Sequence, residues 1–155
     1  MSETYEQMRK RHQEEFNEFP LGAAFSNEQF DKMMYKFGLT PEDTDKILSI
    51  GNGCFIRKSD KESFHEIMKR HSDEMEAAMK DIEFFKSAVL YEMCNHEYGI
   101  NWQGDYDVIN ALGFDVEYSD GSELEKCTEM TYEQKAAYLE AKKEYHKLAI
   151  EKEWF

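Results

Sequence analysis

Histidine, glutamate and cysteine side chains stand at helical spacings in two places, and metal binding is the first chemistry that such spacings suggest. Glu62 and His65 are three residues apart, which puts both on one face of a helix. Carboxylate-bridged di-iron bundles need two such Glu-x-x-His motifs and two further glutamates, and the sequence has no second motif. Glu92 and His96 could share a cation, but no Cys or His spacing matches a zinc finger. We therefore expect no metal and no cofactor.

Nucleophilic catalysis has equally little support in the sequence. Cys94 and His96 are two residues apart and point to different sides of a helix. Neither the Gly-x-Ser-x-Gly elbow nor a phosphate-binding Gly-x-x-x-x-Gly-Lys loop occurs. A calcium loop starting at Asp105 would need Gly at Asn110 and Glu at Val116. We expect a protein that is not an enzyme. An enzyme or ligand-sequestering protein that uses Cys94, His96 and Glu92 is the weakest of three alternatives.

The composition narrows the class of protein further. The chain has 155 residues, 33 acidic and 19 basic side chains and a formal net charge of -14, with 41% hydrophobic residues. This length predicts a single domain over residues 1–155 that buries roughly 70% of its unfolded surface. The negative field repels phosphate, so we expect no direct binding to DNA, RNA or an anionic membrane.

Targeting signals are not apparent. No apolar stretch approaches the roughly 18 residues that a membrane span requires, and no apolar segment follows the basic residues near the N-terminus. The three scattered cysteines suit a reducing compartment better than a disulfide framework. These features predict a cytoplasmic protein.

The negative charge is concentrated in residues 81–130. This segment holds twelve acidic residues against Lys86 and Lys126, whereas residues 131–155 are neutral overall. One interpretation is a solvated face that keeps the protein soluble. The alternative is a surface for a basic partner, because carboxylates spaced about 6 Å apart along a strand or helix resemble a phosphate track. The candidate partner-binding residues are Asp105, Asp107, Asp115, Glu117, Asp120, Glu123, Glu125 and Glu129, interleaved with Trp102, Tyr106 and Tyr118.

Helix signals dominate the pattern that must position these residues. The tetrapeptide Thr-Tyr-Glu-Gln occurs at Thr4 and again at Thr131, and it fits a capping box at both places. Glycines stand where helix C-caps are expected, at Gly38, Gly99 and Gly113. The pattern predicts helices at residues 4–18, 26–37, 41–46, 61–80, 82–98, 105–112 and 131–153.

Two segments read as extended chain. Residues 47–57 place two short apolar runs around Gly-Asn-Gly, which predicts a small β-hairpin that must pack on helices or gain a third strand. Residues 114–118 alternate and precede a Ser-Asp-Gly turn. We expect a mainly α (α+β) fold in which several helices pack around a long central helical segment.

The central segment, residues 61–98, carries the strongest core signal. Apolar side chains recur there at steps of three and four residues, from Phe64 through Met93. A single helix over this range would be about 57 Å long, against a radius of gyration of about 15 Å for a compact domain of this size. We therefore expect a bend or break near Lys80–Glu83.

The last predicted helix ends in two aromatic residues. Tyr138, Ala141, Tyr145 and Leu148 share one face, and Trp154 and Phe155 follow. Terminal aromatics either dock on the core or contact a partner. A homodimer through residues 131–155 is therefore a possible arrangement.

Two stretches of sequence carry a resemblance. The run TYEQMRKRHQEEFNEFPLGAAFSNEQF from Thr4, together with CNHEYG at 94–99, resembles a family of small acidic proteins encoded on phages and conjugative elements of Gram-positive gut bacteria. The resemblance covers roughly residues 3–113, and the family has no assigned activity or site residues. It implies a mobile-element setting, in which acidic proteins commonly imitate DNA, as anti-restriction and anti-CRISPR inhibitors do.

The sequence therefore leads to a specific expectation. We expect a non-enzymatic inhibitor in the cytoplasm of a bacterial host that presents the carboxylates of residues 81–130 to a basic nucleic-acid groove of a host defence nuclease. The alternative is a structural or regulatory adaptor of a mobile element that acts through its C-terminal helix.

Overall fold

The structure is a computed structural model that describes residues 2–154. Within these residues the chain forms seven α-helices and three short strands, which confirms the prediction of a mainly α (α+β) fold. The helices are α1 (Tyr5–Glu18), α2 (Asn27–Lys36), α3 (Lys61–Ala78), α4 (Ile82–Asn95), α5 (Gly104–Ala111), α6 (Glu123–Lys126) and α7 (Tyr132–Glu151). The strands are β1 (Gly22–Ala23), β2 (Ile47–Gly51) and β3 (Cys54–Arg57), and 3₁₀ turns form at Thr44–Lys46 and Lys58–Asp60.

The chain divides into two compact units. One combines the residues up to Arg9 with those from Met75 onward, and the other is Lys10–Glu74. Each has its own cluster of buried apolar side chains. The prediction of a single domain over residues 1–155 stays a prediction.

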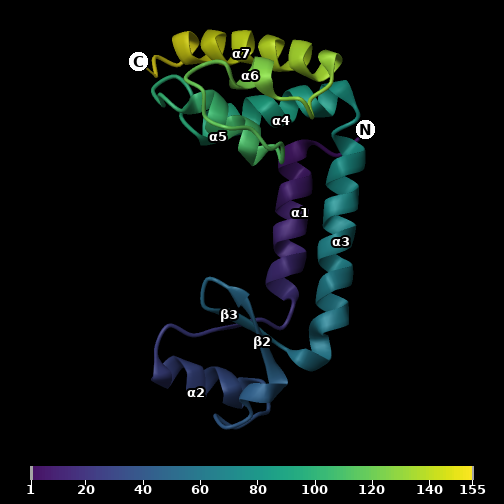
Figure 1. Cartoon of the computed structure of the whole chain (residues 1–155), viewed down its shortest axis with the longest axis vertical. Helices are drawn as coiled ribbons and strands as arrows, with labels where there is room; N and C mark the ends of the chain where they lie inside the picture. The colour runs from purple at the N-terminus through teal and green to yellow at the C-terminus, as the bar shows by residue number, and fades with distance from the viewer. Residues whose placement is uncertain (1, 155) are drawn as a thin grey trace. The chain divides into compact units, whose positions relative to one another are not determined.

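The first unit is built on two long helices that lie against each other. Helix α4 packs along α7, and α5 and α6 complete the unit (Figure 1). Both helices contribute side chains with no exposed surface, because small residues on α7 let the larger ones of α4 approach closely. The fully buried residues of this core include Phe85, Ala88, Val89, Met93, Val108, Ile109, Cys127, Ala141 and Ala149.

Local capping explains where these helices begin. The Asp81 carboxylate accepts a hydrogen bond from the Phe84 N–H at 2.8 Å, which satisfies one of the free donors at the start of α4. At α7, the Thr131 hydroxyl accepts from the Gln134 N–H at 3.1 Å while the Gln134 side chain accepts from the Thr131 N–H at 2.9 Å. This is the predicted capping box.

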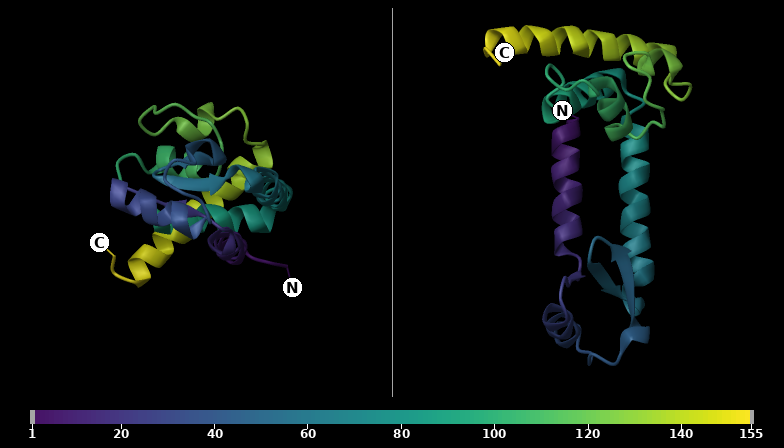
Figure 2. Two further views of the ribbon diagram at one scale, coloured as in Figure 1. Left: turned by 90° about the horizontal axis from the view of Figure 1, so that it is seen from below. Right: turned by 60° about the vertical axis from the view of Figure 1, so that its left-hand side comes forward.

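The second unit contains the sheet. The predicted hairpin forms from β2 and β3 (Figure 2). Strand β1 adds to β3 as a third antiparallel strand, which gives the order β1-β3-β2. The turn needs positive φ at Gly51, Asn52 and Gly53, the residue types that tolerate it. Helix α2 supplies the buried Met33 and Met34 of the accompanying core.

Two local predictions were wrong or incomplete. Residues 41–46 do not form a helix: only the 3₁₀ turn Thr44–Lys46 occurs, because Asp43 accepts from the Thr40 N–H at 2.8 Å and closes a tight turn instead. Residues 114–118 run without turn or bend but pair with no strand. The short elements β1 and α6 had no clear sequence signal.

The central helical segment is broken close to Lys80–Glu83, where a bend or break was expected from its length. Helix α3 ends at Ala78 and α4 begins at Ile82. The apolar stripe is buried only in its second half: Phe85, Val89 and Met93 are inaccessible, whereas α3 contains no buried residue. None of the described helices is long and apolar enough to cross a membrane.

Candidate functional site

The three aromatic residues predicted to contact a partner form one cluster. The Tyr118 ring lies edge-on to Trp102, with centroids 5.6 Å apart, and edge-on to Tyr106 at 6.0 Å. Such T-shaped ring pairs are stabilised by more than the burial of their apolar surface, so they hold the rings in defined positions. Trp102 is 75% exposed and Tyr118 is 40% exposed, so the cluster presents a rigid aromatic face to solvent.

Several of the predicted carboxylates surround this cluster. Asp115, Glu117 and Tyr118 line one hollow of about 300 Å³. Asp120 accepts a hydrogen bond from the Tyr118 hydroxyl at 3.4 Å, and Glu129 accepts from the Asp115 N–H at 3.1 Å. All four carboxylates belong to exposed residues. We call this set the acidic–aromatic surface: Trp102, Tyr106, Asp115, Glu117, Tyr118, Asp120 and Glu129.

The remaining predicted carboxylates do not join that surface. Glu125 is exposed on α6, but no contact connects it to the aromatic cluster. Asp107 is half-buried and accepts from the Asn101 side-chain amide at 2.7 Å. Asp105 and Glu123 are turned inward, where each organises the unit rather than facing a partner.

Asp105 holds two tyrosines together. Its Oδ1 accepts a hydrogen bond from the Tyr98 hydroxyl at 2.7 Å and another from the Tyr138 hydroxyl at 2.6 Å. Burial, followed by the hydrogen bond and charge of Asp105, raises the pKa of both hydroxyls well above the usual tyrosine range. Both tyrosines therefore keep their protons at physiological pH and act as donors.

Glu123 closes the loop at residues 119–121, within the acidic segment. It is 1% exposed, and its two carboxylate oxygens accept from the Ser119 N–H at 3.0 Å and the Gly121 N–H at 2.9 Å. Burial acts to raise the pKa of this carboxyl, but the backbone N–H groups of Ser119, Gly121 and their neighbours outweigh it and lower the pKa. Glu123 thus stays ionised and holds residues 119–121 in place.

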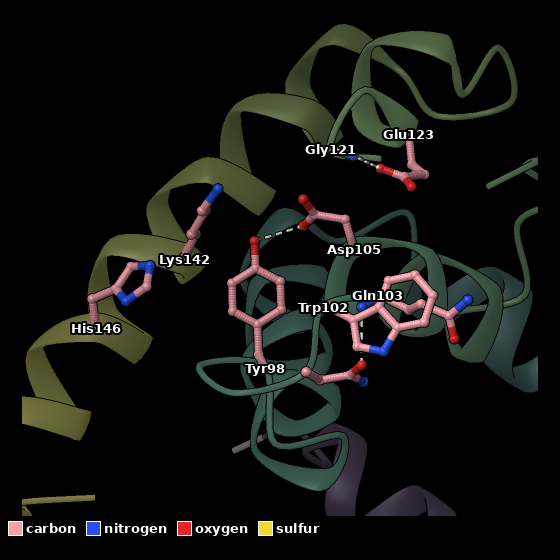
Figure 3. Close-up of a pocket in the computed structure, with 10 residues that line it drawn as sticks. Tyr98, Trp102, Gln103, Asp105, Gly121, Glu123, Lys142 and His146 are labelled. Atoms are coloured by element: carbon pink, nitrogen blue, oxygen red, sulfur yellow. Dashed lines mark hydrogen bonds between the residues drawn. The ribbon is translucent and has the colours of Figure 1, made fainter. Parts of the chain in front are cut away.

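A pocket of about 300 Å³ lies beside the acidic–aromatic surface, and Figure 3 shows the side chains around it. Lys142 and His146 extend from α7 on one side, and Trp102 and Gln103 lie on the other. The Lys142 ammonium stands 5.7 Å from the centre of the Tyr98 ring, which is a cation–π distance. The pocket combines the Lys142 ammonium with the carboxylates of Asp105 and Glu123 and with aromatic and amide groups, so its lining is polar and carries both signs of charge.

Sequence reasoning missed Tyr98, Tyr138, Lys142 and His146 as lining or supporting residues. Lys142 and His146 stand one helical turn apart, but nothing in their spacing shows that they approach Tyr98. Gly104 stands between Gln103 and Asp105 in the sequence, and only the structure shows why a glycine is needed there. A Cβ there would lie 2.7 Å from Cδ2 of Tyr98.

The Glu92 region forms an internal cluster. Glu92 is 1% exposed, accepts from the Tyr5 hydroxyl at 2.8 Å, pairs with Arg9 and lies 3.2 Å from Nε2 of His96. Burial, then the hydrogen bond to Glu92, raises the pKa of Tyr5 to about 12. Glu92 thus connects Tyr5 and Arg9 at the start of α1 to α4 within the first unit.

Cys94 faces a different hollow, which it lines with Glu97, Ile100, Tyr145 and Trp154. Desolvation raises the pKa of this thiol, which disfavours the reactive thiolate. Trp154 packs at 5.8 Å from the Tyr145 ring, and the predicted contact of Phe155 lies outside the described residues. Over residues 2–154, no three His, Cys, Asp or Glu side chains form a group that could hold a metal ion.

The second unit contains a symmetric polar cluster built from a motif that the sequence repeats. Arg-His-x-x-Glu occurs at residues 11–15 on α1 and again at residues 70–74 on α3. The His12 and His71 rings stack with centroids 3.9 Å apart. His12 lies 2.9 Å from Glu74, and His71 lies 3.1 Å from Glu15. Arg11 pairs with Glu74 and Arg70 pairs with Glu15, so each motif binds the other.

We call these six residues the polar clasp: Arg11, His12, Glu15, Arg70, His71 and Glu74. The side chains come from two helices that run in opposite directions, because residue 11 faces residue 74 and residue 15 faces residue 70. The ion pairs of the clasp are only partly shielded from water, and such pairs contribute little individually. The clasp therefore reads as a positioning device for α1 and α3 inside the second unit.

A comparison with known families places the chain. Residues 4–145 match DUF7659, a family of unknown function. The chain belongs to this family. No curated protein and no solved structure matches it. The DUF7659 match contains every residue of the acidic–aromatic surface, whereas His146 and Trp154 lie beyond it.

Proposed function

We propose that this DUF7659 protein is a non-enzymatic inhibitor that binds a basic, nucleic-acid-binding groove of a host defence nuclease through its acidic–aromatic surface. The observation that carries the proposal is the gathering of exposed aromatic rings and exposed carboxylates on one part of the chain. Trp102 and Tyr118 supply rigid anchoring area, and Asp115, Glu117 and Asp120 supply charge.

The charge arrangement favours a basic partner over a neutral one. Residues 81–130 hold twelve acidic and two basic residues, and Asp115 and Glu117 both lie on the surface of one hollow. A concentrated negative field steers a basic groove toward it and accelerates association at low salt. The mobile-element origin suggested by the sequence resemblance is part of this proposal, because such elements benefit from inhibiting host nucleases.

Charge reversal tests the proposal. The surface variant combines Asp115→Lys with Glu117→Lys, and the control variant combines Glu76→Lys with Glu151→Lys. All four residues are exposed, and both controls lie in the last turn of a helix, where a cation is favourable. The two variants change the net charge equally. A difference in partner binding between them therefore shows that the location of the carboxylates matters, and not only the total charge.

Each immobilised protein captures partners from a bacterial lysate at low and at high salt, and a DNA duplex is added as competitor. We expect the wild type and the control to retain a nucleic-acid-acting enzyme at low salt that duplex DNA displaces. The surface variant should associate at least about tenfold more slowly. Equal capture by both variants, or capture that duplex DNA leaves unchanged, would exclude the proposal.

The second candidate function is an adaptor that binds through its C-terminal region, and one observation favours it. The hollow beside Cys94 has a volume of about 310 Å³ and is bordered by Ile100, which is 69% exposed, and Trp154. Deleting residues 150–155 and replacing Ile100 with Glu should release an adaptor's partner, as measured by light scattering. The inhibitor keeps its partner after both changes.

A further inference from the structure

Residues 114–119 have the pattern of a strand although they pair with none. The chain passes through them without turn or bend. Phe114 and Val116 pack against the core of the first unit, whereas Asp115 and Glu117 are exposed. This alternation places apolar side chains on the inner face and carboxylates on the outer face, as in a strand at the surface of a sheet.

Side chains bond two of the three N–H groups on one edge of this extended segment, those of Asp115 and Ser119, and the Glu117 N–H between them makes no hydrogen bond within residues 2–154. In extended chain, the N–H and C=O groups of alternate residues point to the same edge. The Asp115 N–H donates to Glu129 Oε1 at 3.1 Å, and the Ser119 N–H donates to Glu123 Oε1 at 3.0 Å. Two glutamates thus occupy the positions that carbonyl groups of a neighbouring strand would take.

The opposite edge is open. The peptide groups of Val116 and Tyr118 make no hydrogen bond to any residue in the range 2–154. Unpaired backbone donors and acceptors in an extended segment form a template for another strand. Tyr118 is part of the aromatic cluster, and Val116 lies between Asp115 and Glu117. The open edge therefore runs along the acidic–aromatic surface.

The charge along the segment specifies what could pair there. Asp115 and Glu117 stand two residues apart on the outer face, about 6.6 Å along the chain, and Lys126 is the basic residue that shares their hollow. Opposite charges on neighbouring strands stabilise a pair, and like charges destabilise it. The neighbour that fits carries basic residues at alternate positions and apolar residues between them.

We propose that the partner inserts an extended basic segment as a new strand along the Val116–Tyr118 edge. Its main chain pairs with the open peptide groups, and its basic side chains lie beside Asp115 and Glu117 on the outer face. Strand addition of this kind draws affinity from main-chain hydrogen bonds and selectivity from alternate side chains. The inference rests on the proposed function for the partner's identity and adds the mode by which it binds.

A peptide of alternating lysine and valine tests this mode directly. Bound to the full chain, it should slow amide hydrogen exchange at Val116 and Tyr118 by at least about tenfold, since their N–H groups gain partners. Exchange at Asp115 and Ser119 should stay nearly unchanged because those N–H groups are already bonded. Equal protection of all four amides, or none, overturns the proposal.

Backbone methylation supplies the matched control. One peptide is N-methylated at its lysines and another at its valines, and both keep the same side chains. Because a strand pairs along one edge only, one of the two should lose binding and the other should retain it. If both bind like the unmethylated peptide, charge attraction alone holds the peptide and strand addition is excluded.

A charge exchange keeps the test independent of folding defects. The Asp115→Lys, Glu117→Lys variant should lose the lysine–valine peptide and gain a glutamate–valine peptide, with an unchanged circular dichroism spectrum. Failure to gain it overturns the proposal. A nuclease that binds without protecting Val116 and Tyr118 overturns this inference and leaves the proposed function standing. If the peptide adds as a strand but no nuclease is captured, the proposed function fails and the strand-addition site stands.

Discussion

At the scale of single residues, hydrogen-bond partners decide whether a carboxylate faces a binding partner. Asp105 and Asp115 are both acidic residues of the same charged segment. Asp105 is bonded to two tyrosine hydroxyls, whereas the Asp115 side chain belongs to an exposed residue at a hollow. Charge reversal at Asp105 would therefore disturb the unit itself, and only the exposed carboxylates are informative for binding.

Replacing Asp105 with Ala should lower the free energy of unfolding by about 2–5 kcal/mol, because two partly buried tyrosine hydroxyls lose their acceptor. Urea denaturation followed by tryptophan fluorescence measures the loss. As a control, Asp115→Asn should change stability by less than about 0.5 kcal/mol. A loss below about 1 kcal/mol for Asp105→Ala would show that the tyrosines find other partners.

At the scale of elements, the polar clasp links stability to pH. Hydrogen bonds from Arg70 and His71 lower the pKa of Glu15 to about 2, and those from Arg11 and His12 lower the pKa of Glu74 to about 2. A carboxyl whose pKa is depressed on folding stabilises the folded state above its unfolded pKa. The ordinary value for these groups is 4.5, so their contribution is complete above that pH.

We therefore expect stability to fall as the pH is lowered from 4.5 toward 2, because the folded clasp resists protonation of Glu15 and Glu74. Circular dichroism over this range, in the wild type and in a Glu15→Gln, Glu74→Gln variant, measures the effect. The variant should show a flatter acid profile. Identical profiles would mean that other carboxylates govern acid unfolding.

The capping box at the start of α7 is a local device with its own test. Thr131→Ala removes the acceptor for the Gln134 N–H and should cost about 1 kcal/mol of stability. Thr128→Ala, at an exposed residue outside any helix, is the matched control and should be close to neutral. Thermal unfolding distinguishes the two, and equal midpoints would argue against the cap.

At the scale of the whole molecule, the two cores share no residue. Phe85 belongs to the first and Met34 to the second, and both are completely buried. Both tryptophans, Trp102 and Trp154, lie in the first unit. Tryptophan fluorescence therefore reports on that unit alone, whereas circular dichroism reports on both.

Phe85→Ala should cost about 3–5 kcal/mol and lower the unfolding midpoint seen by fluorescence. Met34→Ala should cost about 2–5 kcal/mol and lower a transition seen by circular dichroism, with a smaller effect on fluorescence. Coincident transitions by both probes in every variant would show that the two cores unfold as one cooperative unit.

Sequence reasoning identified most helices because their signals are local. Thr131 and Gln134 of the capping box are three residues apart. Gly51 and Gly53 adopt the positive φ that the hairpin turn needs, and glycine allows this without help from distant residues. The same locality placed Trp102, Tyr106 and Tyr118 among candidate contact residues, and the structure brings their rings together. It failed for residues 41–46, where the Asp43 side chain accepts from the Thr40 N–H and only a short 3₁₀ turn forms.

The amino-acid sequence by itself determined the helical character, the hairpin and the concentration of acid in residues 81–130, because capping, periodicity and charge act over a few residues. Only the tertiary structure decided which acids face solvent. Asp105 meets Tyr138, 33 residues away, and Glu123 turns back on its own loop, whereas Asp115 and Glu117 remain outside. The physical reason is that a carboxylate's exposure depends on long-range packing, which no local pattern encodes.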